Sequence, residues 1–401
     1  MVEGLLCGQA RALDLHGVVD LRAAAVSASP SWLHGGMGKL RYDDSGVRLG
    51  QATLEASGEL LDQVVDNLSA TVVANIHDDR RGAAGVNEAF ISWNPVPGGP
   101  WKTRVKAGAF FPVTSLELDY DSVGWTPTRT VSSSAINSWI GEELRTKGIE
   151  LTFSRNGRLA GSPHDFSITA ALYKWNDETG TLLAWRGWSI SERITSLTEP
   201  LPLPDLPVYR EGTGFIDQTR AIHPFREIDD RTGFYVSSTY AWRGWLELTA
   251  MHYDNRANPM AYEDDQWGWT TRFNHVGLRA RPGNGWEWVL QAMDGSTLVG
   301  PRGVNARYRS WFALASHALG PGTATLRYDH FGISEDDIAP ADPNTEHGHA
   351  LALAYALELR PEWTLVTEAL RVDSTRAARA LIGVAPRQRE RSLSVSLRYR
   401  F

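Results

Sequence analysis

The chain has 401 residues with 16 Trp, 37 Gly, one cysteine (Cys7) and a formal net charge of −7. A single cysteine excludes a disulfide framework within the chain, and the acidic balance argues against a nucleic-acid partner. No apolar run approaches the about 18 residues that a transmembrane helix needs, so a helical membrane protein is excluded as well.

Residues 1–12 have features of a residual leader. Residues 10–12 (Ala-Arg-Ala) match the small-x-small form of a signal-peptidase site, and an alternating segment begins at Leu13. The residues before this site include the acidic Glu3 and lack both a basic start and a long hydrophobic core. A short disordered tail is the alternative interpretation. In either case we expect one folded unit over residues 13–401.

Alternation of apolar and polar residues recurs along this whole unit, between clusters of Gly, Pro, Asn and Asp. This period of two predicts β-strands, and we count sixteen of them. An even number is what a closed antiparallel barrel with both ends on one side of a membrane requires. The predicted strands are 13–27, 46–57, 67–78, 86–94, 102–112, 143–155, 164–176, 232–241, 244–255, 267–281, 285–294, 303–318, 323–333, 346–360, 363–374 and 389–401.

The connections between these strands are sorted by length. Counting back from the C-terminus, every second connection is a short turn, such as 360–362, 282–285 and 242–244. The intervening connections are longer on average and more polar. Short periplasmic turns that alternate with long outer loops are typical of transmembrane barrels. The longer connections are 28–45, 113–142, 177–231, 256–266, 334–345 and 375–388.

The last strand is the clearest amphipathic segment. Its odd positions are apolar or aromatic and its even positions are small or charged, so one face suits lipid and the other suits water. It ends in an aromatic pair, which a membrane barrel places in its interfacial girdle. The apolar face comprises Leu393, Val395, Leu397, Tyr399 and Phe401.

This terminus resembles the closing strand of Gram-negative outer-membrane β-barrels. The fold class that follows is an all-β, transmembrane antiparallel barrel of sixteen strands, with short periplasmic turns and long extracellular loops. A soluble all-β domain with a half-buried edge strand is the alternative.

The inner face of the barrel follows from the same alternation. In strand 102–112 it turns Lys102, Arg104 and Lys106 inward, and in the last strand it adds Arg398 and Arg400. Basic side chains in a pore favour anions. The alternative is that they pair with lumen carboxylates and give no selectivity. In strand 303–318 we place Ala306, Tyr308, Phe312 and Leu314 outward, which turns Arg307 and Arg309 inward.

The longest connection, 177–231, is the candidate constriction loop. It contains an expected hairpin around residues 185–188 and a proline-rich stretch at 200–207. A long loop with its own structure is usually functional, although a simple extracellular cap is equally consistent with the sequence. Its candidate constriction residues are Arg186, Arg193, Arg210 and Arg220.

No motif of a catalytic or cofactor site is present. The sequence lacks GxSxG, HExxH, CxxC and a phosphate-binding glycine loop. His347 and His349 share a strand face, which suits a polar strand entrance better than a metal site. No cofactor or metal is therefore expected. Loop-bound calcium is the alternative, because acidic clusters at 78–79, 229–230, 263–265 and 335–337 offer oxygen ligands.

Three segments carry a family resemblance. Residues 88–95 (EAFISWNP), 105–112 (VKAGAFFP) and 141–150 (GEELRTKGIE) resemble strands of the phosphate-selective porin O/P family. The resemblance implies a sixteen-stranded, usually trimeric porin with an inward-folded loop that passes phosphate or small organic anions. The arginines of 177–231 are scattered among acids, which departs from the arginine-rich constriction of that family.

The expected function is passive diffusion of small solutes, favouring anions, through a homotrimeric porin of the bacterial outer membrane. Its surroundings would be outer-membrane lipids and lipopolysaccharide. An outer-membrane enzyme that hydrolyses lipids or peptides is one alternative. A soluble carbohydrate-binding protein is another, and it would line one groove with Trp267, Trp269, Trp286 and Trp288.

Overall fold

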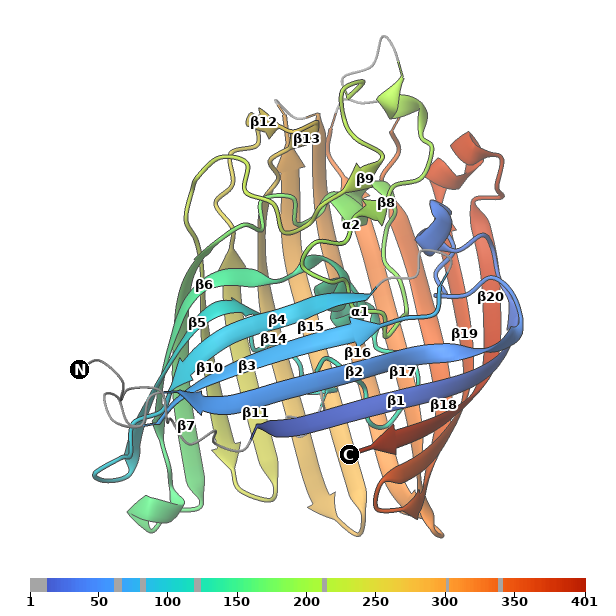
Figure 1. Ribbon diagram of the computed structural model, residues 1–401. Helices are drawn as coiled ribbons and strands as arrows, with labels where there is room; N and C mark the ends of the chain where they lie inside the picture. The colour runs from blue at the N-terminus through green and yellow to red at the C-terminus, as the bar shows by residue number, and fades with distance from the viewer. Residues whose placement is uncertain are drawn as a thin grey trace, which may run out of the picture.

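The computed structural model describes residues 13–60, 67–79, 84–118, 124–210, 215–300, 303–337 and 342–401. Sixteen antiparallel strands form one closed barrel (Figure 1). The leader expected at 1–12 lies outside the described residues. The barrel strands are β1 (Asp14–Ser27), β2 (Gly46–Leu60), β3 (Leu68–Ile76), β4 (Ala84–Trp93), β5 (Trp101–Phe110), β6 (Thr146–Arg155), β7 (His164–Lys174), β10 (Gly233–Trp242), β11 (Leu246–Asp254), β14 (Thr270–Gly283), β15 (Trp286–Val299), β16 (Val304–Leu319), β17 (Gly322–Glu335), β18 (Glu346–Arg360), β19 (Trp363–Arg376) and β20 (Arg387–Arg400).

The barrel closes where β1 pairs with β20 in antiparallel register. The last residue joins this seam, because Gly17 N–H donates to Phe401 O at 2.9 Å and Phe401 N–H donates to Gly17 O at 3.2 Å. The Phe401 ring lies against Gly17, where a Cβ atom would approach it to 2.2 Å. Closure leaves no unpaired strand edge in the barrel.

All sixteen predicted strands are confirmed, with ends that differ from the prediction by at most five residues. The sorting of the connections is confirmed as well, because short turns, such as the two-residue turns between β14 and β15 and between β16 and β17, share one end of the barrel (Figure 1). We call this the turn end, and the opposite end the loop end. In transmembrane barrels the turn end is periplasmic.

The outer surface is apolar, as the alternation predicts. In β18, Leu351 and Leu353 are 46% and 57% exposed, whereas Ala350 and Ala352 are buried. Exposed and half-buried aromatic side chains gather at the turn end, where a membrane interface would lie. This aromatic belt comprises Trp93, Trp101, Phe153, Trp242, Trp245, Trp286, Trp288, Trp363, Tyr399 and Phe401.

The tryptophans proposed for a carbohydrate groove lie at two heights. Trp267 and Trp269 precede β14 at the loop end, whereas Trp286 and Trp288 begin β15 at the turn end. Trp269 is buried, whereas Trp286 and Trp288 are exposed. The two heights are those expected of a barrel and not of the single groove of a carbohydrate-binding protein, although Trp269 packs inside against Trp185 and does not join an outer belt.

The connections between the barrel strands contain short helices, strands and 3₁₀ turns. The hairpin predicted around residues 185–188 is wrong, because helix α2 ends at Trp185 and no pair of strands in the described residues flanks this segment; the hairpin of this loop is instead β8–β9. None of the described helices has the length and apolarity that crossing a membrane requires. The elements are α1 (Ala135–Glu143), α2 (Thr181–Trp185), β8 (Leu201–Pro202), β9 (Ala221–Ile222), β12 (Tyr262–Glu263), β13 (Gln266–Trp267) and the 3₁₀ turns Trp32–His34, Arg158–Ala160, Pro207–Tyr209 and Ala377–Ile382.

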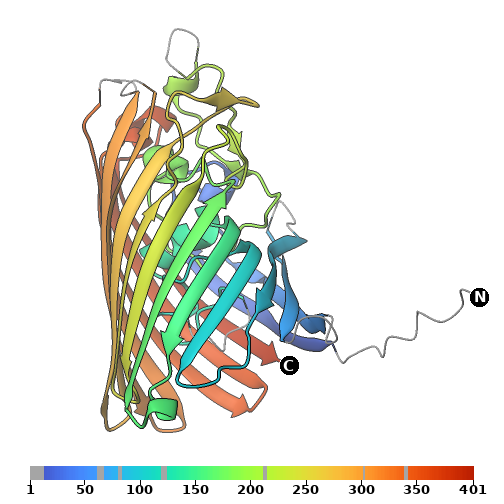
Figure 2. The ribbon, with the colours of Figure 1, turned by 90° about the vertical axis from the view of Figure 1, so that its left-hand side faces the viewer.

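The wall of the barrel has two heights. Strands β14 to β20 have 14 to 16 residues each, whereas β3 to β7, β10 and β11 have 9 to 11. Figure 2 shows the tall wall on one side and the lower wall on the other, with α1 and α2 between them. The loops that follow the short strands therefore have room to fold inward.

Candidate functional site

Two loops fold into the barrel and fill its middle. We call residues 111–118, 124–145 and 176–197 the inner plug. Almost all of its side chains are buried, including every residue of α1 and α2. The expected constriction loop 177–231 supplies only part of this plug, and the connection between β5 and β6 supplies the rest.

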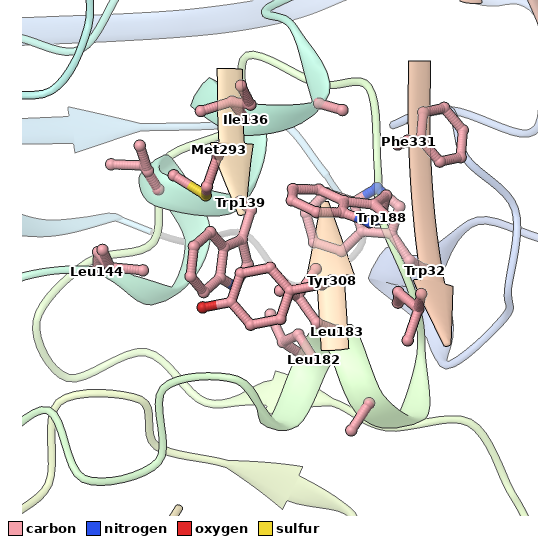
Figure 3. Close-up of a cluster of buried hydrophobic side chains, with 14 of the residues drawn as sticks. Trp32, Ile136, Trp139, Leu144, Leu182, Leu183, Trp188, Met293, Tyr308 and Phe331 are labelled. Atoms are coloured by element: carbon pink, nitrogen blue, oxygen red, sulfur yellow. The ribbon is translucent and has the colours of Figure 1, made fainter. Parts of the chain in front are cut away.

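The plug has an aromatic core. Figure 3 shows Trp139 of α1 and Trp188 packed against Tyr308 of the barrel wall. The ring centroid of Trp139 lies 6.0 Å from Trp188, 5.3 Å from Tyr308 and 5.6 Å from Phe273, in edge-to-face contacts. Such pairs add about 0.5–1.5 kcal/mol beyond the burial of their area. The Trp188 Nε1–H donates to Gly332 O at 3.2 Å, so the ring also has a fixed polar partner.

A buried arginine anchors the plug to the tall wall. Arg327 of β17 pairs with Asp329 at 2.9 Å and with Glu117 of the plug at 2.7 Å. Its guanidinium also donates to the carbonyl oxygens of Ser132 at 2.5 Å and Ser133 at 3.0 Å. Charge-assisted bonds of this kind are about twice as strong as neutral ones. The plug backbone is thereby tied to one inner wall.

The start of α1 strengthens the same anchor. Glu368 of β19 accepts the Val131 N–H at 2.9 Å, and Asp329 accepts the Ala135 N–H at 3.1 Å. Ser134 caps the helix by accepting from Asn137 N at 3.3 Å. Carboxylates at a helix N-terminus satisfy free N–H groups and complement the positive end of its dipole. The sequence of this segment therefore fits its position against an acidic wall.

A second charged cluster ties the plug to the seam of the barrel. Glu192 of the plug pairs with Arg41 at 2.5 Å and also with Arg22, and Arg22 pairs with Asp20 at 2.5 Å. Burial alone would raise the pKa of Glu192, but the two guanidinium groups outweigh it and lower this pKa to about 2. The carboxylate therefore stays ionised across physiological pH.

One acid of the plug behaves in the opposite way. Glu143, the last residue of α1, is fully buried and accepts the Leu182 N–H at 2.9 Å and the Trp139 Nε1–H. Burial raises its pKa to about 7, although these hydrogen bonds and Arg186 act against the shift. The junction between α1 and α2 therefore contains a carboxyl group that loses its proton near neutral pH.

The basic residues predicted on 102–112 lie in β5 and face the lumen. Glu150 of β6 is within 3.4 Å of Arg104 and 3.6 Å of Lys106, and it also accepts a hydrogen bond from Tyr235. Lys102 lines a cavity of about 280 Å³ near the turn end, together with side chains of β6, β7 and β10. Pairing with a lumen carboxylate, the alternative weighed above, thus applies to two of the three.

The two arginines predicted on the last strand also face inward. Arg398 is buried and donates to the plug carbonyls of Pro127 at 2.7 Å and Thr130 at 3.0 Å. Arg400 lines a cavity of about 400 Å³ at the turn end, near Arg129 and Glu358. Arg398 therefore anchors the plug, and Arg400 borders an open cavity.

The assignment of faces in strand 303–318 is wrong. Arg307 and Arg309 of β16 are exposed on the outer surface, and Arg309 lies 3.8 Å from the equally exposed Asp294. Tyr308 and Phe312 face inward instead and are buried in the core of the plug. The physical reason is that the plug fills the lumen at this height. The inward side chains of β16 therefore pack against the plug and are mainly apolar, and the charged side chains face outward.

The candidate constriction arginines fall into two pairs. Arg186 is buried, bound to Glu142, and Arg193 is buried between Asp79 at 2.8 Å and Glu199 at 2.5 Å. Both fix the plug internally. Arg210 and Arg220 lie at the loop end, exposed beside the exposed Asp205 at 3.9 Å and 2.8 Å. The structure does not bring the two pairs together.

The anchors Arg327, Asp329 and Glu117 were missed at the sequence level. A signal existed, because Arg327 and Asp329 alternate with the apolar Leu326 and Tyr328 in the predicted strand 323–333. Glu117 lies in a connection without period, and its role arises only when that loop folds inward.

The acidic clusters that the sequence offered as calcium ligands do not come together in the structure. Asp229 alone joins a group of three carboxylates, with Asp177 and Glu227, whose oxygens lie within 4.8 Å of one another. Asp177 accepts the Ile228 N–H at 2.7 Å, and its burial raises its pKa to about 7. These oxygens serve as acceptors for loop backbone. His349 projects from the outer wall, 3.9 Å from Asp373.

The fold was compared with known proteins. No family model and no curated protein sequence matches the chain. Among solved structures, the outer membrane channel DcaP of Acinetobacter baumannii superimposes with a TM-score of 0.57 at 10% identity, covering 97% of both chains. An anion-selective porin from Comamonas acidovorans gives 0.52 at 14% identity, covering 97% of this chain and 99% of the other.

A trimer form of OmpT, an outer membrane protein of Vibrio cholerae, gives a TM-score of 0.53 at 9% identity, covering 97% of this chain and 99% of the other. Identities this low establish the architecture alone. The chain therefore has the sixteen-stranded barrel fold of bacterial outer-membrane porins.

Proposed function

We propose that the protein is a porin of the bacterial outer membrane, through which small solutes diffuse passively without catalysis or energy coupling. The observation that carries the proposal is the sorting of side chains around a closed barrel. Apolar side chains face outward from the turn end up to the level of the outward arginines near the loop end, and polar or charged ones face the lumen at the turn end. Hydrocarbon outside and water inside require this sorting.

We infer a preference for small anions, such as phosphate or organic acids. Lys102, Arg104 and Lys106 line one side of the lumen, and Glu150 is the acid that pairs with them in the described residues. At the cavity near the turn end, Lys102 and Arg155 share the lining with a single acid, Asp165. Rows of basic side chains in a pore lower the electrostatic barrier for anions and raise it for cations.

The proposed assembly is a homotrimer surrounded by outer-membrane lipids and lipopolysaccharide. Two observations support it: the exposed apolar band needs a lipid or protein partner, and the fold is that of a protein described in a trimer form. Large exposed apolar surfaces of this kind do not persist in water.

Planar-bilayer recording of the detergent-purified chain tests the proposal. Stepwise conductance and a reversal potential of anionic sign in a salt gradient are the expected results. A reversal potential of cationic sign would overturn the anion preference and leave the pore intact. A polypeptide that stays soluble without detergent, or inserts without any conductance, would overturn the porin itself and favour the enzyme alternative in the second case.

A further inference from the structure

A cluster of arginines projects from the outer wall near the loop end. Arg371 of β19 lies directly opposite Arg391 of β20 in the strand register. Leu351 of β18 flanks Arg371, and Ser27 of β1 flanks Arg391, so the four residues form one row. Like charges directly opposite each other on a sheet destabilise it. An anion bound between the two guanidinium groups would remove this repulsion.

Four arginines share this outer surface with one acid. We call Arg371, Arg387, Arg389 and Arg391 the outer arginine cluster. Asp373 pairs with Arg371 at 2.6 Å and with Arg389 at 2.8 Å, in both cases through the Nε atom, and the two arginines stay 48% and 51% exposed. Among the described residues, no carboxylate lies within ion-pair distance of Arg387 or Arg391. Three positive charges are in excess.

The cluster lies at a defined depth. Arg371 is eight residues from Trp363 along β19, and Arg391 is eight residues from Tyr399 along β20, so each lies about 27 Å along its strand from the aromatic belt. With a strand tilt of about 40°, the rise across the membrane is about 21 Å, close to the about 25 Å of the apolar band. The cluster therefore lies at the far boundary of that band.

An apolar groove runs from the cluster toward the middle of the band. Its volume is about 540 Å³, and its walls include Leu351, Leu353, Leu393, Ala25 and Ala369. Arg371 and Arg391 line the same groove. Leu353, Ala369, Leu393 and Ala25 form the row immediately on the turn-end side of the arginines. A cationic head above an apolar trough matches a molecule with an anionic head and a hydrocarbon tail.

We propose that this surface binds a phosphorylated glycolipid of the outer leaflet, with a phosphate between Arg371 and Arg391 and one acyl chain in the groove. Guanidinium groups bind phosphate bidentately, and an interfacial position lets the arginines keep their charge. The site rests on the outer-membrane placement of the barrel and is independent of solute passage through the lumen.

Binding of lipid A to the full chain in detergent, measured by native mass spectrometry, tests this site. The double variant Arg371→Gln/Arg391→Gln is expected to reduce the lipid A adduct at least tenfold. Ala25→Phe, which fills the groove without changing charge, is expected to reduce it as well. Lipid A stripped of its phosphates, and glucosamine phosphate without acyl chains, are each expected to bind weakly to the unchanged chain.

Arg307→Gln is the matched control, because it removes an outward arginine at the loop end that lies outside the groove. Equal lipid A binding by the control, the double variant and the unchanged chain would overturn the proposal. A double variant that alters the oligomeric state while lipid A binding persists would also overturn it, since the face would then be an interface between copies. Bilayer conductance of the variants, measured separately, reports on the porin proposal.

Discussion

In the middle of the barrel the lumen is filled by Trp139, Trp188 and Tyr308, which exclude water, whereas at the turn end it is lined by charged and hydroxyl side chains around open space. The charges also behave differently. Against the plug Arg327 is buried and paired with two carboxylates, while at the turn end Lys102 borders a cavity. Under the proposed function, the packing of the plug would set the width of the solute path, and the charges at the turn end would set the preference among ions.

The sharpest way to break this division is to release the plug. Arg327→Met leaves Glu117 and Asp329 without their buried partner, which we expect to cost about 3–5 kcal/mol of stability. The plug should detach from β17, and single-channel conductance should rise. Arg309→Met on the outer wall removes one exposed pair and is expected to cost less than about 1 kcal/mol. Unchanged conductance in Arg327→Met would refute the anchoring role.

A second test uses pH. Because the pKa of Glu143 is raised to about 7 in the folded state, the folded chain holds a proton that the unfolded chain has already lost above about pH 4.5. Stability of the plug therefore falls as pH rises from 4.5 to 7, by about 3 kcal/mol in total. We expect conductance to increase with pH over this range, and Glu143→Gln to abolish the increase. A pH response that survives in the variant would assign it to another group.

Removing the charges at the turn end should alter the preference among ions and leave the width of the solute path unchanged. Replacing Lys102, Arg104 and Lys106 by Gln is expected to move the reversal potential toward cations at similar conductance. A single charge 4 Å from an ion in water is worth about 1 kcal/mol, or about fivefold in local ion concentration. The control is Arg307→Gln/Arg309→Gln on the outer face, for which no shift is expected.

The smallest effect is expected at the mouth. Arg210→Gln and Arg220→Gln disrupt exposed pairs with Asp205, worth at most about 1 kcal/mol each. Conductance and reversal potential should stay within error of the unchanged chain. A clear change in either would place the mouth, and not the plug, in control of passage.

Much of the barrel is predictable because strand patterning is local. In β18 and β20 the lipid-facing side alternates strictly with the lumen side, so ends and faces both follow from the sequence. In β16 the same alternation led to the opposite assignment, since Tyr308 and Phe312 serve a dry plug while Arg307 and Arg309 face outward. An apolar strand face indicates that the face is shielded from water, but it does not indicate whether lipid or protein covers it.

The plug itself lay beyond sequence reasoning for a related reason. Glu117 binds Arg327 across 210 residues, and Glu192 binds Arg22 across 170. Neither pairing follows from a period or a motif, because both depend on how far a loop reaches after the wall has formed. The candidate constriction arginines Arg186 and Arg193 were found for their charge, but their buried partners fix the plug instead of facing a solute.

The seam between β1 and β20 has a consequence for biogenesis. The two ends of the wall are separated by nearly the whole chain, so the cylinder cannot be completed until the final strand has been synthesised and has found the first. Until then both margins expose unpaired amide and carbonyl groups, which attract foreign strands. Contacts this distant in sequence also form slowly. We therefore expect assembly of this protein to need a chaperone or assembly factor that covers the open edges of β1 and β20.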